Sequence, residues 1–246
     1  MTTERIAMVA ITRHGAERLA TLGPKMPEAD LYISQKFADL LSNLPNRVVP
    51  ISIAVREAVA KLFASYDQLL FVFSIGAAVR LISPCLKSKE EDPGVVVVDD
   101  AGRFVVPILS GHLGGANAFA TEVATLLNAV PVMTTASESL GTLPVDILGR
   151  ELGWQVEAPK NNLVRVAARV VNGEPIAFIQ EMGSREWWPA GKALPDNIYL
   201  FETFEAVDLN RYKGLLWVTE RHIDEGIWQQ LEGRLVVYRP PQGSGA

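Results

Sequence analysis

The chain is 246 residues long, 48% hydrophobic and 21% charged, with a net charge of −5. This length and composition are typical of one large or two small globular domains. The acidic balance argues against a protein that binds nucleic acid through a basic surface, and no apolar run is long enough to cross a bilayer. The lone cysteine, Cys85, excludes an intrachain disulfide and a multi-thiolate metal site, so we expect a cytoplasmic protein.

The first 140 residues alternate between strand-like and helix-like patterns. Helices are predicted over 16–22, 53–66, through 79–82, and over 116–127. Strands are predicted over 5–11, 29–33, 47–50, 69–73, 95–98, 104–109 and 130–134. The run Asp-Asp-Ala-Gly at 99–102 has the composition of a hairpin turn. This alternation predicts a Rossmann-like open α/β sheet, mostly parallel, with one hairpin in it.

The pattern changes from about residue 141. Helices are predicted over 145–152, 163–171 and 223–231, and strands over 175–180, 215–219 and 235–238. Residues 182–197 are rich in Gly, Pro and Trp and are expected to form a loop. We therefore expect two domains, a first over 1–140 and a second, smaller α/β domain over 141–240, followed by a disordered tail over 241–246.

The most informative stretch is residues 109–117, which read Leu-Ser-Gly-His-Leu-Gly-Gly-Ala-Asn. These residues stand where a predicted strand passes into a predicted helix. A helix N-terminus presents unpaired N–H groups and a partial positive charge, which favour an anion. His112 can move a proton near neutral pH or bind a metal. The stretch therefore indicates a site for an anionic ligand with acid–base chemistry, and the alternative is a glycine-rich tight turn without function.

Four loops that follow predicted strands are small or polar and are expected to form one site. In a parallel α/β sheet, ligands bind outside the carboxyl ends of the strands. The loops are Thr-Arg-His-Gly at 12–15, Ser-Ile-Gly at 74–76, Ser-Gly-His at 110–112 and Thr-Thr-Ala-Ser at 134–137. We expect all four to meet at that edge of the sheet.

Several motifs together resemble the CbiG family, the cobalt-precorrin-5A hydrolases of anaerobic cobalamin biosynthesis. The motifs are residues 74–84, 87–99, 102–103, 109–117 and 131–136, in unbroken order across 71–137. The resemblance extends more weakly over the first predicted strand and over the segment after 141, which is similar to the family's middle domain. Full-length members carry a third, C-terminal domain that this sequence does not include. A non-catalytic corrinoid carrier that needs a partner supplying that domain is therefore the alternative to an enzyme.

The resemblance implies a hydrolase that opens a lactone on a ring-contracted cobalt corrinoid and releases acetaldehyde, giving cobalt-precorrin-5B. It implies no resident cofactor, because the cobalt belongs to the anionic substrate, and the sequence contains no metal-binding motif. The expected partners are a separate C-terminal-domain protein or other corrin-pathway enzymes, with neither nucleic acid nor membrane. A nucleotide-binding module is a third interpretation, which the missing Walker lysine and the absent GxGxxG spacing weaken.

Attack of water on a lactone carbonyl needs a base and preformed donors for the oxyanion. On this basis His112 is the expected general acid or base, with Glu90 and Asp99 as candidates for a second acid–base group. Contact of His112 with the substrate's cobalt, or a purely structural role in its turn, stays open. The N–H groups expected to bind the oxyanion or a substrate carboxylate belong to Gly111, Gly114 and Gly115.

The remaining substrate-binding candidates are polar or small residues of the same motifs: Ser74, Gly76, Arg80, Lys87, Lys89, Ser110, Asn117, Thr134 and Thr135. Each has a structural alternative, such as an ion pair for Arg80, a solvated charge run for the lysines and a turn or cap for Ser110 and Asn117. Trp187 and Trp188 are expected to pack between the domains, with a lid over the flat macrocycle as the alternative.

Overall fold

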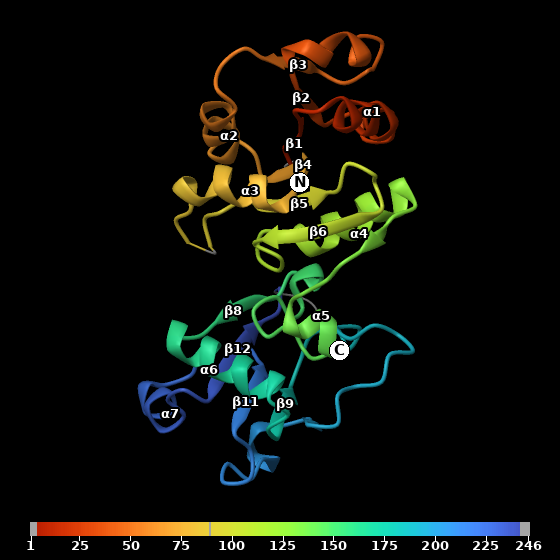
Figure 1. The fold of residues 1–246 in the computed structure, drawn as a ribbon. Helices are drawn as coiled ribbons and strands as arrows, with labels where there is room; N and C mark the ends of the chain where they lie inside the picture. Colours follow the sequence, from red (N-terminus) through yellow and green to blue (C-terminus); the bar gives the residue numbers. More distant parts are fainter. Residues whose placement is uncertain (1–3, 89, 242–246) are drawn as a thin grey trace. The chain divides into compact units, whose positions relative to one another are not determined.

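The computed structural model describes residues 4–88 and 90–241 (Figure 1). The chain divides into two compact units, of which one ends at Thr134 and the other begins at Thr135. Each unit is built on its own sheet. The expectation of two mostly parallel α/β sheets, with a hairpin in the first, is confirmed.

The first unit contains a seven-stranded sheet with the order β3-β2-β1-β4-β5-β6-β7. Its strands are β1 (Ile6–Ala10), β2 (Asp30–Ser34), β3 (Val48–Ile51), β4 (Gln68–Val72), β5 (Gly94–Val98), β6 (Phe104–Leu109) and β7 (Val130–Pro131). The strands β1 to β5 are parallel, β6 is antiparallel to β5, and β7 is parallel to β6. The three central strands β1, β4 and β5 are buried along their whole length, as their nearly continuous apolar runs require.

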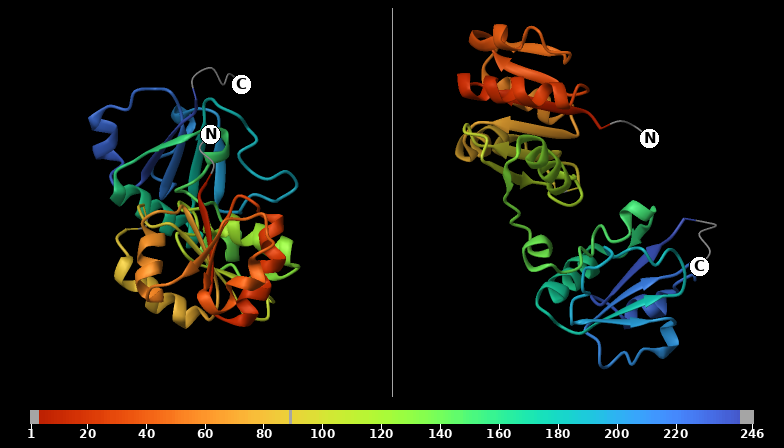
Figure 2. Two further views of the ribbon diagram at one scale, coloured as in Figure 1. Left: turned by 90° about the horizontal axis from the view of Figure 1, so that it is seen from above. Right: turned by 90° about the vertical axis from the view of Figure 1, so that its right-hand side faces the viewer.

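Helices cover both faces of this sheet (Figure 2). They are α1 (Arg13–Leu22), α2 (Val55–Phe63), α3 (Ile75–Ile82) and α4 (Ala116–Leu127), with 3₁₀ turns at Gly23–Lys25, Gln35–Leu41 and Ser83–Cys85. The helices α1 and α4 pack on one face, through side chains such as Leu19 and Phe119. The helices α2 and α3 pack on the opposite face, through side chains such as Leu62 and Ile82.

The second unit contains a five-stranded sheet with the order β10-β9-β11-β12-β8. Its strands are β8 (Gln155–Glu157), β9 (Ile176–Gln180), β10 (Ile198–Phe201), β11 (Gly214–Val218) and β12 (Leu235–Arg239), and only β8 is antiparallel to its neighbour. The helices are α5 (Ala136–Leu140), α6 (Lys160–Val171) and α7 (Glu225–Gln230), with 3₁₀ turns at Arg150–Leu152 and Phe204–Ala206. The helix α6 packs on one face of the sheet and α7 on the other.

One predicted element is wrong and another is too long. The helix predicted over 145–152 is a series of turns ending in a short 3₁₀ turn, because Gly149 and Gly153 adopt left-handed backbone conformations. The ring of Trp154 packs directly on Gly149, where a Cβ would lie 2.2 Å from the ring atoms. The strand predicted over 130–134 pairs with β6 only at Val130 and Pro131. The short strands β8 and β10 are absent from the sequence prediction.

Within the described ranges, no helix combines the length and the apolar character that crossing a bilayer requires. The predicted tail lies, from residue 242 onward, outside the described residues.

Candidate functional site

The hairpin β5–β6 separates the four loops that were expected to meet. Since β6 runs against β5, with Leu109 beside Val95 and Val105 beside Val98, the loop after β6 lies at the amino edge of the parallel strands. The loops at 12–15 and 74–76 follow β1 and β4 and lie at the opposite, carboxyl edge. The expectation of a single site at the carboxyl edge is therefore wrong. Thr134 and Thr135 mark the junction between the two units.

The loop at 110–115 winds tightly into the first turn of α4. Gly115 donates its N–H to the carbonyl of His112 at 3.1 Å, and Asn117 donates its N–H to the carbonyl of Gly111 at 3.0 Å. Gly115 has a φ of +76°, and Ser110 has a φ of +51°. A left-handed conformation at a residue other than glycine costs free energy, and such positions cluster at functional sites. The loop is therefore held in a strained shape by its neighbours.

The hydrogen bonds of this loop revise the list of oxyanion donors. The N–H of Gly115 is already bound to His112 O, so it is not available to a ligand in this conformation. Among the described residues, the N–H groups of Gly111 and Gly114 make no hydrogen bond. Those two groups, rather than all three, are the backbone donors that the loop can offer to an anion.

A residue absent from the sequence prediction, Gln68, fixes the back of the loop. Gln68 begins β4, is 1% exposed, and donates its side-chain N–H to the carbonyl of Gly114 at 2.6 Å. A Cβ added at Gly94 would lie 2.1 Å from Gln68 Oε1 and 2.6 Å from Gly114 O. Glycine at 94 therefore allows the strand, the amide and the loop to pack this closely. The available signal was a glutamine inside a buried apolar strand, since buried polar groups need partners.

This region contains buried polar side-chain atoms that have no hydrogen-bond partner among the described residues. Ser110 Oγ and Gln68 Oε1 are such atoms. Leaving such an atom unsatisfied costs about 1–3 kcal/mol, and native structures contain few of them. Ser110 belongs to the His112 loop, and Gln68 binds the loop from β4. The loop and the residue that holds it therefore have hydrogen-bonding capacity that the described residues do not use.

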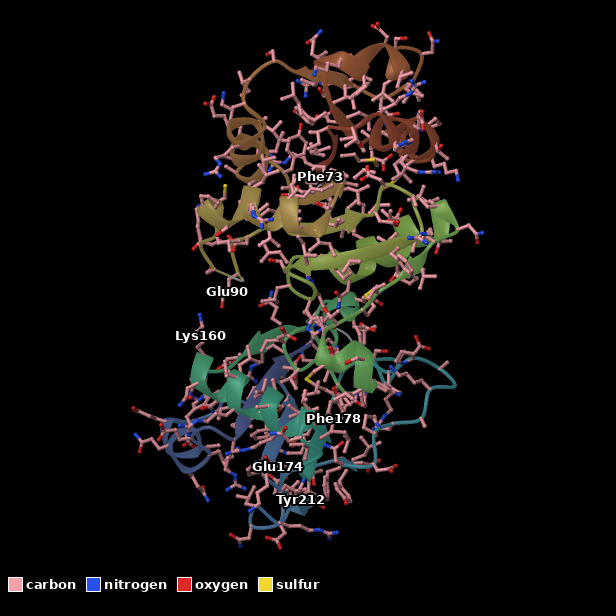
Figure 3. All side chains as sticks on the ribbon, viewed as in Figure 1. Phe73, Glu90, Lys160, Glu174, Phe178 and Tyr212 are labelled. Atoms are coloured by element: carbon pink, nitrogen blue, oxygen red, sulfur yellow. The ribbon has the colours of Figure 1, made fainter. Side chains whose placement is uncertain are left out.

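The charged candidates of the segment 86–93 lie at the same edge as the His112 loop, because this segment enters β5 at Gly94. Asp92 is buried and accepts the backbone N–H of Lys87 at 3.0 Å. Lys87 Nζ stands 3.6 Å from Glu91 Oε2, with both side chains exposed. Glu90 is exposed on the same turn (Figure 3). Lys89 lies outside the described residues.

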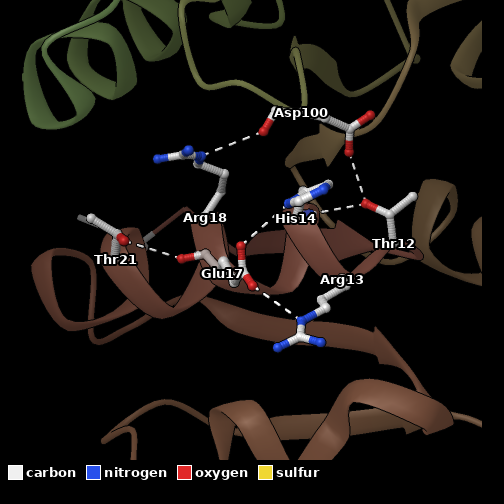
Figure 4. Close-up of polar contacts among 8 residues, drawn as sticks. Thr12, Arg13, His14, Glu17, Arg18, Thr21 and Asp100 are labelled. Atoms are coloured by element: carbon white, nitrogen blue, oxygen red, sulfur yellow. Dashed lines mark hydrogen bonds and ion pairs between the residues drawn. The ribbon is translucent and has the colours of Figure 1, made fainter.

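The carboxyl edge carries a different polar network (Figure 4). Thr12 Oγ1 caps α1 by accepting the N–H of Gly15 at 2.9 Å, and it donates to Asp100 Oδ1 at 2.8 Å. His14 Nδ1 lies 3.3 Å from Glu17 Oε2, one turn along the exposed face of α1. Hydrogen bonding from His14 lowers the pKa of the Glu17 carboxyl. The bond between Thr12 and Asp100 joins the β1–α1 turn to the turn of the β5–β6 hairpin, so this network stabilises the fold.

The other candidates at the carboxyl edge are also engaged in the fold. Asp99 Oδ1 accepts the N–H groups of Arg103 and Phe104, both at 2.7 Å. Burial raises the pKa of the Asp99 carboxyl, but these N–H donors and the Arg103 charge outweigh burial and leave the pKa lowered. Asp99 therefore stabilises the hairpin turn at the edge opposite His112, and it cannot act together with His112 on one atom. Ser74 N-caps α3 without a side-chain bond, and Arg80 Nη1 donates to Gly76 O at 2.9 Å.

Across residues 4–88 and 90–241, no three His, Cys, Asp or Glu side chains cluster closely enough to hold a metal ion.

Comparison with known proteins agrees with this architecture of two α/β units. Residues 57–138 match the family described as cobalamin synthesis G N-terminal, and residues 143–240 match the cobalamin biosynthesis central region. A solved structure described as a putative cobalamin biosynthesis protein G homolog from Sulfolobus solfataricus has the same fold. Its TM-score is 0.50 at 21% identity, covering 96% of this chain and 60% of that chain.

Two curated relatives are named cobalt-precorrin-5A hydrolase. The protein of Priestia megaterium is 41% identical over 235 residues, which are 95% of this chain and 62% of the relative. The protein of Salmonella typhimurium is 33% identical over 190 residues, which are 76% of this chain and 49% of the relative. The chain belongs to the CbiG family, of which it contains the N-terminal and central regions. It spans about half to three-fifths of the length of these relatives.

Proposed function

We propose that this chain acts in cobalamin biosynthesis as a cobalt-precorrin-5A hydrolase, opening the lactone of its cobalt-corrinoid substrate and releasing acetaldehyde. The observation that carries the proposal is the 41% identity, over 95% of this chain, to a relative named for that activity. A non-catalytic carrier is not favoured, because the curated relatives that match are named as hydrolases.

We place the reaction at the His112 loop. Three features support this position: the strained backbone at Ser110, the buried Ser110 hydroxyl without a partner in the described chain, and the two N–H groups of Gly111 and Gly114 that the fold leaves unbonded. No other strand-to-helix loop of the first unit combines a histidine with these features in the described residues. The groups needed for acyl chemistry are thus present in one short segment.

The proposed chemistry assigns one task to each group. His112 takes a proton from water as the water oxygen adds to the lactone carbonyl, and the N–H groups of Gly111 and Gly114 stabilise the oxyanion. Breaking the ester C–O bond leaves a carboxylate on the ring and a hydroxyl on the two-carbon fragment. Release of acetaldehyde then removes the hydroxyl proton, breaks a C–C bond and leaves its electron pair on the macrocycle, which takes up a proton. Glu90, on the turn at the same edge, is our candidate for a second proton carrier.

The remaining expectations follow from the substrate. Its carboxylates would pair with Lys87 and Lys89 in the segment 86–93. The cobalt would arrive with the substrate, and no resident cofactor is needed for hydrolysis. We propose that the protein works in the cytoplasm, in agreement with its lone cysteine, and together with a C-terminal-domain protein or other corrin-pathway enzymes.

The test is an anaerobic assay of acetaldehyde released from cobalt-precorrin-5A by the purified chain. We expect His112→Ala to lower kcat by at least about a hundredfold, the usual contribution of a general base. The matched control is His14→Ala, at the opposite edge of the sheet, which should keep the wild-type rate. A His112→Ala protein with full activity would remove His112 from the mechanism. If the folded wild type is inactive, adding the separately expressed C-terminal region of the Priestia megaterium relative tests whether that region is required.

A further inference from the structure

The second unit contains a cavity of about 500 Å³ that the proposed reaction does not use. Its lining comes from the strands β9 and β10, from Glu202 after β10 and from the loop at 182–197. Phe178, labelled in Figure 3, and Leu200 are neighbours in the register of β9 and β10, and we call these two lining side chains the floor of the cavity. The lining residues are Phe178, Gln180, Arg185, Trp187, Trp188, Leu194, Leu200, Phe201 and Glu202. Its size is that of a site for a small molecule.

The aromatic wall of the cavity is fixed before any ligand binds. The ring of Trp187 packs on Phe178 with a centroid distance of 4.1 Å and an interplanar angle of 31°. Trp187 donates its indole N–H to Gln180 Oε1 at 2.9 Å. Gln180 is 5% exposed, and its own N–H groups bond to three carbonyls of residues 182–184 at 2.8 to 3.3 Å. Because these side chains are already ordered, little of their conformational entropy would be lost when a flat ligand stacks here.

The floor and the rim differ in polarity. Leu200 leaves 61% of its surface exposed, which is a large value for a leucine beside a cavity. At the rim, Arg185 Nη2 lies 4.0 Å from Glu202 Oε1, with 67% and 86% of the two side chains exposed. Ion pairs this exposed contribute little to stability. The guanidinium of Arg185 can therefore exchange its partner for the carboxylate of a ligand, which it can bind with two parallel hydrogen bonds.

We propose that this cavity binds a planar, largely apolar small molecule that carries a carboxylate. The ring of Trp187, which packs on the buried ring of Phe178, provides the flat contact. Leu200 provides the apolar floor, and Arg185 the charge that recognises the anion. Every lining residue belongs to the second unit, whereas the His112 loop belongs to the first. The proposal is thus independent of the proposed reaction and can fail or succeed without it.

The test uses 2-naphthoate and its neutral analogue 2-naphthylmethanol, with binding to the full chain measured by calorimetry. We expect the wild type to bind 2-naphthoate more tightly than 2-naphthylmethanol. Arg185→Gln should lower the affinity for 2-naphthoate about tenfold, because it removes a charge-assisted hydrogen bond. The affinity for 2-naphthylmethanol should change by less than about twofold. Glu202→Gln should strengthen 2-naphthoate about twofold, because it removes a like charge from the rim. Arg211→Gln, an exposed arginine outside the lining, is the matched control and should change neither probe.

Leu200→Asn provides a second arm, in which both probes should weaken because the floor becomes polar. Since Leu200 is mostly exposed, this variant is expected to fold, which circular dichroism can check. The proposal is overturned if the folded wild type binds neither probe, if it binds both equally, or if Arg185→Gln weakens the alcohol as much as the acid. Unchanged binding in Leu200→Asn would also overturn it.

Discussion

At the scale of single residues, the position of Gly114 depends on one buried amide. Gln68 joins the first residue of β4 to the carbonyl of Gly114, and Gly94 packs against both. The side chain is far from water, so the bond it makes cannot be replaced by solvent. We therefore regard Gln68 as a positioning residue for the loop that carries His112.

Gln68→Met keeps the volume of this side chain and removes its N–H donor. We expect the free energy of unfolding to fall by about 1–3 kcal/mol, because Gly114 O is left without its partner. We also expect kcat to fall more than KM changes, because a displaced loop misplaces the base and the N–H donors. Urea unfolding and the acetaldehyde assay measure the two effects.

The matched control for Gln68 is Asn46→Leu in the same unit. Asn46 is another buried amide, and it donates to the carbonyls of Met26 and Ala29 at 2.8 and 3.1 Å, away from the His112 loop. This variant should lose stability and keep the kcat of the wild type. An equal loss of kcat in both variants would mean that Gln68 acts only through the stability of the fold.

At the scale of elements, the hairpin explains why the position of the site was not predicted. The apolar runs and the Asp-Asp-Ala-Gly turn are sufficient to predict the central strands of the first sheet and the antiparallel pair β5–β6. The consequence for the loop after β6 was missed, because an antiparallel strand delivers its following loop to the opposite edge of the sheet. The carboxyl-edge rule applies to strands that run in the common direction, and β6 does not.

Other differences between prediction and structure also have local causes. The apolar spacing over 145–152 is typical of a helix, but the packing of Trp154 on Gly149 overrides this tendency. The strands β8 and β10 are short, and each lies at an edge of the second sheet with a single neighbouring strand. Their sequences therefore lack the long apolar runs that are typical of central strands. The role of Gln68 depends on a contact with a residue 46 positions away, which no local pattern reveals.

Arg5 and Asp67, the residues that precede the paired strands β1 and β4, contact each other at the amino edge of the sheet. Asp67 Oδ2 accepts the backbone N–H of Arg5 at 2.8 Å and lies 3.5 Å from its guanidinium Nε. The backbone N–H of Arg5 lowers the pKa of the Asp67 carboxyl below its ordinary value of 3.8, with the Arg5 charge as a smaller cause. A carboxyl with a lowered pKa stabilises the fold above its unfolded-state pKa and loses this effect as the pH falls through the folded-state pKa.

Asp67→Asn should therefore reduce the free energy of unfolding at pH 7 and have a diminishing effect as the pH falls from about 5 to about 2. Urea unfolding at a series of pH values measures this difference. Arg5→Gln is the companion variant, since it removes the guanidinium and keeps the backbone N–H. It should retain most of the pH dependence, whereas a loss as large as that of Asp67→Asn would show that the ion pair is the main cause.

At the scale of the whole molecule, each sheet has its own core and its own polar loops. In the first unit, the two edges of the sheet have different tasks: contacts among turns occupy the carboxyl edge, and the His112 loop occupies the amino edge. In the second unit, the cavity lies beside an edge strand. The sequence predicted the class of both units, but the division of tasks between edges required the strand directions.

The edge strand β10 also affects how the protein behaves at high concentration. It ends its sheet with Tyr199 and Leu200 exposed, 38% and 61% respectively, and with one row of backbone groups facing outward. An apolar strand edge of this kind is a template on which a second chain can add a strand. We expect Leu200→Lys to reduce light scattering during heating and to raise the concentration at which the protein precipitates. Arg165→Gln, at an exposed position of α6 away from this strand edge, should do neither. The solubility of the chain in storage and crystallisation would then depend mainly on the side chain at position 200.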